Sequence, residues 1–171
     1  MTLVDAVFTR ADFMKLPEGF PAQLVEGFLV REPAPSFEHQ TLKGRIFVAL
    51  HARVGDRRVV AAPLDVVLDE LNVFQPDIVC FADPLPLDTE RVPVPILAVE
   101  ILSPSTRTRD RGVKTRRLLA AGVREVWLVD PRAATIDVCT TGGTRVFREE
   151  DEAASHVVRD FTLTPNALFA S

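Results

Sequence analysis

The sequence predicts an α/β fold in which helices cover a mixed β-sheet, and three observations support this prediction. Residues 36–54 carry apolar side chains at the spacing of a helix. Residues 96–102 and 123–130 are apolar runs of strand length, as expected of strands covered on both faces. A second helix is expected between these strands, at 108–121. A strand–helix–strand order is typical of a crossover connection in a layered α/β domain.

Composition and charge are those of a globular protein. The 171 residues suffice for one ordinary domain, and we expect a single domain over 1–171. The net charge of -4 argues against a protein that coats nucleic acid non-specifically. No apolar run is long enough for a membrane span, and residues 1–20 lack the pattern of a signal peptide. Cys80 and Cys139 fit buried core positions in a reducing compartment, so a cytoplasmic location without membrane association is expected.

The N-terminal third is expected to form a short helix, a hairpin and a long helix. Thr9 is suited to cap a helix over 9–16, and residues 23–31 suggest a tight hairpin or a bulged strand that turns at Gly27. Ser36 is expected to cap the long helix, and Gly55 to end it. His39 should point to the same side as the apolar face of this helix, which consists of Leu42, Ile46, Ala49, Leu50 and Val54.

The remaining elements are predicted mainly as strands. Three strands are expected at 58–62, 64–68 and 74–81, followed by an exposed loop over 82–94 that is rich in Pro and Asp. The strand at 96–102 leads into the helix at 108–121, which Gly122 should end. After the strand at 123–130, a hairpin is expected from 135–140 and 145–148 around Gly142 and Gly143. The tail from Phe161 gives little signal.

Two acids, Asp77 and Glu100, lie in segments that otherwise have the pattern of buried strands. A buried carboxylate is costly unless a cation or hydrogen-bond donors pair with it. Because alternate side chains of a strand share a face, the two acids can converge if their strands are neighbours. Such hard oxygen ligands suit magnesium, or manganese in its place. A metal held there could activate water and stabilise charge during phosphodiester hydrolysis.

Lys114 is the third candidate. It belongs to a helical stripe that also holds apolar residues and so should face the sheet, where an ammonium group needs an anionic partner; the stripe consists of Asp110, Lys114, Leu118 and Ala121. Lys114 could orient the attacking water or offset developing negative charge. Simpler explanations exist for each residue: Asp77 could cap a turn, Glu100 could pair with an arginine, and Lys114 with Asp110. The three residues together favour a site.

Several runs resemble the Uma-two family, described as restriction endonucleases of the PD-(D/E)XK nuclease superfamily. The resemblance extends from about Phe8 to Phe161, and it is carried by Gln75-Pro-Asp77, Ala98 to Thr106, Asp110 with Lys114, and Gly122 to Pro131. It implies a restriction-endonuclease-like core, a mixed sheet of four or five strands with helices on both sides. It also implies magnesium on Asp77 and Glu100, a contribution from Glu26 at the edge of the site, and a homodimer.

The sequence departs from the superfamily pattern at two positions. The usual lysine, two residues after the second acid, would fall at Leu102 and is absent. The resemblance implies that Lys114, on the following helix, takes its place. Relatives tend to carry tyrosine where this chain has Leu118, so a hydroxyl contact is missing there.

Four further residues are candidates for contact with substrate. His39 could touch substrate or act as an auxiliary base, or it could be a core-edge histidine bonded to a backbone carbonyl. Arg107, Arg109 and Arg111 flank the expected acidic strand end and could contact phosphates. The alternative for the arginines is a solvated helix face.

Two functions of different classes follow from these residues. The first is a metal-dependent nuclease that acts on DNA. The second is a non-catalytic binding or assembly module with the same fold, suggested by the acidic pI and the missing superfamily lysine. A glycosidase-like carboxylate pair is a weaker third idea, because few aromatic side chains are available to stack on sugars.

Overall fold

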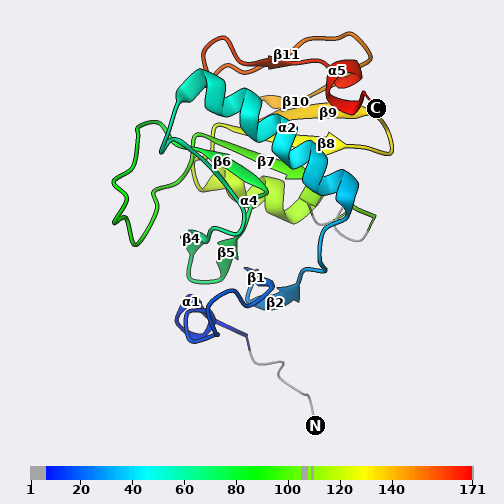
Figure 1. The fold of residues 1–171 in the computed structure, drawn as a ribbon. Coiled ribbons are helices and arrows are strands. Elements are labelled where there is room, and N and C mark those ends of the chain that lie inside the picture. Colours follow the sequence, from blue (N-terminus) through cyan, green and yellow to red (C-terminus); the bar gives the residue numbers. More distant parts are fainter. Residues whose placement is uncertain (1–6, 105–107, 109, 171) are drawn as a thin grey trace.

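The computed structural model describes residues 7–104, 108 and 110–170, and its centre is a six-stranded mixed sheet (Figure 1). The strand order is β10-β9-β8-β7-β6-β3. The β7–β8 pair is parallel and the other pairs are antiparallel, which confirms the predicted mixed sheet and its crossover connection. The sheet has six strands, more than the four or five that the family resemblance implied. The strands are β3 (Val59–Ala61), β6 (Ile78–Cys80), β7 (Leu97–Ile101), β8 (Glu125–Asp130), β9 (Thr135–Thr140) and β10 (Gly143–Arg148).

Helix α2 (Phe37–Val54) packs on one face of this sheet. Both predicted ends of this helix are confirmed. The Ser36 side chain caps its start by accepting the His39 N–H at 3.2 Å, and Gly55, with φ 75°, ends it. The predicted apolar face is also confirmed, since it packs against the side chains of β6 and β7 that point to this side. The helix is thereby fixed to β7, which contains Glu100, and to β6, which Asp77 precedes.

The opposite face is covered by a π-helix, η1 (Asp110–Lys114), and the short helix α4 (Thr115–Ala120). Leu118 is fully buried there against the alternate residues of the strands, including Val79 and Ala98. The sequence predicts one regular helix over 108–121. Thr108 is helical, but Asp110–Lys114 forms a π-helix, which is wound more widely than an α-helix and contains Lys114. Gly122 ends the helix with φ 105°, as predicted.

A separate four-stranded sheet lies beside α1 (Arg10–Phe13), below the main sheet in Figure 1. The predicted hairpin supplies two of its strands and is confirmed. The prediction of one strand over 74–81 is wrong. The chain leaves β5 after Phe74 and enters β6 at Ile78, in the other sheet, because Pro76 has no N–H for a ladder. The four strands are β1 (Ala22–Val25), β2 (Phe28–Arg31), β4 (Val66–Asp69) and β5 (Asn72–Phe74).

The C-terminal tail forms elements that the sequence analysis did not predict. These are β11 (Ala153–Ala154), β12 (Thr162–Leu163) and α5 (Pro165–Phe169). Arg45 of α2 donates to the Leu168 carbonyl at 2.8 Å, so the tail is tied to the long helix. A signal for α5 was present, since Thr164 caps it and Pro165 occupies its first turn. No helix among the described residues is long and apolar enough to cross a membrane.

Candidate active site

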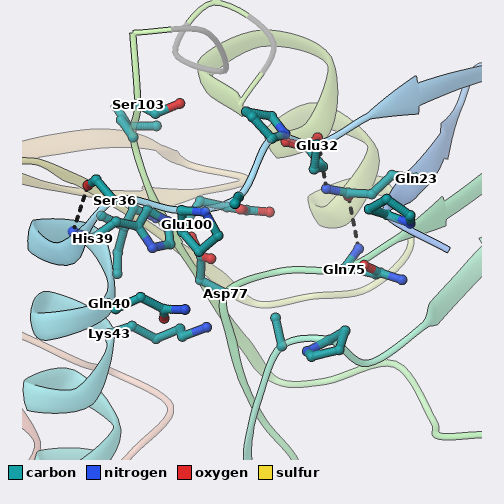
Figure 2. A pocket seen from close by; sticks show the side chains of 18 of the residues that line it. Gln23, Glu32, Ser36, His39, Gln40, Lys43, Gln75, Asp77, Glu100 and Ser103 are labelled. Atoms are coloured by element: carbon teal, nitrogen blue, oxygen red, sulfur yellow. Dashed lines mark hydrogen bonds and ion pairs between the residues drawn. The ribbon is translucent and has the colours of Figure 1, made fainter. Parts of the chain in front are cut away.

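A cavity of about 800 Å³ lies between the start of α2, the hairpin of β1 and β2, and the ends of β6 and β7 (Figure 2). Its lining includes four of the residues singled out from the sequence, which are His39, Asp77, Glu100 and Lys114. His39 reaches it from the first turn of α2. The wall beyond these residues is rich in proline and also contains amide side chains.

The two acids come together as the strand pattern predicts. β6 and β7 are antiparallel neighbours with Ile78 opposite Val99, so the residues one step further, Asp77 and Glu100, lie side by side. Asp77 precedes β6 and is not part of a strand. Its Oδ2 accepts the Ile101 N–H at 2.8 Å and lies 3.1 Å from His39 Nε2. Figure 2 shows the carboxylates of both acids at the middle of the cavity.

Glu100 and Lys114 form a buried ion pair. Lys114 Nζ lies 2.6 Å from Glu100 Oε1, and the side chains are only 2% and 5% exposed, respectively. The Lys114 ammonium also lies 5.9 Å from the centroid of the Phe74 ring, a distance that allows a cation–π contact. The π-helix η1 thus places Lys114 in contact with Glu100 of β7.

Residues of α2 form one side of the cavity. Figure 2 shows Gln40 and Lys43 extending from the helix into the same space as His39. Lys43 makes no ion pair with the described residues. The sequence analysis did not identify Lys43, although it lies one helical turn after His39 and therefore on the same stripe.

The opposite side is a polar wall whose side chains are joined by hydrogen bonds. Gln23 is 4% exposed; its Oε1 accepts the Gln75 N–H at 2.9 Å and its Nε2 donates to Glu32 at 3.2 Å. Gln75 in turn donates to Asp65 at 2.8 Å. These residues connect the hairpin of the small sheet to the segment that carries Asp77. Sequence reasoning missed this network, because its members come from three separate segments.

Glu26 and Arg111 are not among the described residues that line the cavity. Glu26 lies in the turn between β1 and β2 and accepts a hydrogen bond from Arg117 Nη2 at 2.7 Å. Arg111 pairs with Asp130 and Asp137 of the sheet. Partial burial opposes its charge, but the hydrogen bonds to Asp137 and Asp130 outweigh this and raise the pKa of Arg111.

The other two arginines that were predicted to contact phosphates, Arg107 and Arg109, lie outside the described residues.

The donor set suits a hard, well-hydrated cation. Among the described residues, no group of three or more His, Cys, Asp or Glu side chains could enclose a metal. Magnesium needs no such group, because one or two carboxylates and several waters satisfy it. Both hydrogen bonds to Asp77 go to Oδ2, and Oδ1 accepts none from the described residues. The pair Asp77 and Glu100 therefore fits magnesium or manganese better than zinc.

Comparisons with known proteins found one matching family and a solved structure with a similar fold. A family described as "Putative restriction endonuclease", Uma2, matches residues 10–166. The fold is similar to the crystal structure of "a putative nuclease belonging to DUF820" from Anabaena variabilis, with a TM-score of 0.82. That match has 24% identity and covers 95% of this chain and 98% of the other. No curated protein matches the chain.

Proposed function

The chain belongs to the Uma2 family, described as "Putative restriction endonuclease", and we propose that it is a metal-dependent endonuclease that hydrolyses phosphodiester bonds of DNA. One observation carries the proposal. The register of β6 and β7 sets Asp77 beside Glu100 in a cavity, with the buried Lys114 bonded to the second acid. Two carboxylates can hold one divalent metal, and a cation beside them can stabilise the charge that develops during phosphodiester hydrolysis.

We assign magnesium, or manganese, to Asp77 and Glu100. When bound, such an ion supplies an activated water and stabilises the charge of the scissile phosphate. The two acids hold it, and the cavity is large enough to admit a phosphate group beside them. The remaining work belongs to the side chains around the acids.

Lys114 is proposed to supply positive charge where it is not screened by water. Its ammonium is bonded to Glu100 and is 2% exposed, so its position is set before substrate arrives. A preorganised charge of this kind can orient the attacking water or offset charge on the phosphate at no cost of rearrangement. Lys43 extends into the same cavity from α2 and is suited to contact a phosphate of the DNA. Arg107 and Arg109 stay candidates for the same contact.

One observation favours the alternative, a non-catalytic module that binds nucleic acid or assembles with a partner. Both acids already have partners inside the protein: Asp77 has His39 and a backbone N–H, and Glu100 has Lys114. A site that is satisfied in this way could be purely structural. Metal binding separates the two functions. We also propose that the protein is a homodimer, and its molar mass in solution, measured by light scattering, would test this.

The test is cleavage of plasmid and linear DNA with magnesium, with manganese and with EDTA. We expect cleavage by the wild type only with metal, and its loss in Asp77→Asn and Glu100→Gln, which keep the size of each side chain. Asp83→Asn is the control, because this acid lies in the exposed loop 82–94. Circular dichroism would show that each variant is folded. If the folded wild type cleaves no nucleic acid and binds neither ion, the proposal is wrong.

A further inference from the structure

We infer that His39 is a positioning residue, which holds the Asp77 carboxylate so that its Oδ1 faces the metal. The inference deepens the proposed function and rests on it, since it concerns the ion that Asp77 would hold. It assigns to His39 a role different from the contact with substrate that the sequence suggested.

The hydrogen bonds of Asp77 divide its two oxygens. Oδ2 accepts the Ile101 N–H at 2.8 Å and lies 3.1 Å from His39 Nε2, while Oδ1 accepts no bond from the described residues. Donors on one oxygen fix the rotation of the carboxylate and leave the lone pairs of the other for a ligand. The side chain is 16% exposed, so a small part of it reaches the cavity.

The His39 ring is itself held in place. The Ser36 hydroxyl accepts the His39 N–H at 3.2 Å, and α2 is anchored on the sheet by buried side chains such as Leu42. The ring is 15% exposed. Its Nδ1 is buried and has no hydrogen-bond partner among the described residues, so Asp77 is the polar partner that orients the ring. Because its Nε2 is bonded to Asp77 and the ring is largely buried, the His39 ring is poorly placed to contact substrate.

Asp77 needs such support because of its place in the chain. It lies between Pro76 and the first residue of β6, and the Ala62 N–H donates to its backbone carbonyl at 2.9 Å. This bond holds the backbone of Asp77 but does not fix the rotation of its carboxylate. The Ile101 N–H binds Asp77 Oδ2 from one side, and the hydrogen bond to His39 is the second contact that orients this oxygen. Partners that orient a metal ligand are worth about 10- to 100-fold in metal affinity.

The experiment measures manganese affinity by calorimetry, without DNA. We expect His39→Ala to weaken binding by roughly 10- to 100-fold. In His39→Gln the amide nitrogen can donate in place of Nε2, and we expect most of the affinity to return. His51→Ala is the matched control, because His51 is an exposed histidine of the same helix that stacks on Phe47 and does not line the cavity.

Three results would count against these claims, and they are distinguishable. If His39→Ala binds manganese as tightly as the wild type, the inference is wrong and the proposed function stands. Equal losses in His39→Ala and His39→Gln would also overturn it, because the ring itself would then be needed. If the wild type binds no manganese, the proposed function fails first. Thermal melting without metal would show that the variants are folded, and His39→Gln serves if the alanine variant is not.

Discussion

Removal of Lys114 should destabilise the folded protein, because it would take away the cation that is paired with a buried carboxylate. The perturbation is Lys114→Met, which keeps the length of the side chain and removes its charge. Lys114 is 2% exposed and its partner Glu100 is 5% exposed, so water cannot replace the lost contact at 2.6 Å. The substitution tests the ion pair directly, without any assumption about catalysis.

The magnitude follows from the burial of the pair. Breaking a buried ion pair by removing one partner costs about 3–5 kcal/mol. For a chain of 171 residues, each kcal/mol changes the melting temperature by roughly 2–4 °C, so we expect a decrease of roughly 6–20 °C. A loss of about 3–5 kcal/mol is a large part of the free energy of unfolding of an ordinary domain, which is about 5–15 kcal/mol.

The assay is urea unfolding of four proteins: the wild type, Lys114→Met, Glu100→Gln and the double variant. With both charges removed, no buried ion is left unpaired, so the double variant should be more stable than Lys114→Met. Lys15→Met is the control, because Lys15 pairs with Asp12 on the surface and should matter little. If Lys114→Met is as stable as this control, or if the double variant is the least stable of the four, the reasoning about the pair is wrong.

Four further predictions concern other parts of the structure. Arg111→Ala should lower the free energy of unfolding by about 2–3 kcal/mol, less than a fully buried pair because the side chain is 36% exposed, and urea titration would measure it. Burial raises the pKa of Cys80 and Cys139 above the ordinary 9.0, so neither thiol should react with Ellman's reagent at pH 8 until urea unfolds the chain. Stability should also fall as pH rises above 9.0, because these thiols ionise more readily in the unfolded chain. Ser36→Ala should cost about 1 kcal/mol in thermal unfolding by removing the cap of α2.

The elements that were predictable from the sequence are those whose signals are local. Ser36 and Gly55 mark the two ends of α2. The Ser36 side chain accepts a backbone N–H of the first turn, and Gly55 adopts the positive φ at which the helix ends. The continuous apolar run before Leu102 predicted a central strand, and β7 is buried on both faces. Alternation along a strand is also a local rule and predicted which side chains share a face with each acid. That the two acids meet depended in addition on the pairing of β6 with β7, which the sequence analysis had only assumed.

The elements that were not predictable depend on contacts between distant segments. The run 74–81 has strand-like composition throughout, and only the presence of a second sheet explains why it is divided at Pro76. The π-helix around Lys114 carries no known local signal, whereas in the structure its lysine is bonded to a carboxylate of the sheet. The contact between His39 and Asp77 joins residues 38 positions apart, and a single sequence does not reveal it.

The most direct test of the central claim is a crystal soaked in manganese and measured for anomalous scattering. We predict one peak in the cavity, at about 2.1 Å from Asp77 Oδ1 and from a carboxylate oxygen of Glu100. A soaked crystal with no peak between these two acids, or with manganese bound only elsewhere on the protein, would contradict the claim that they share an ion.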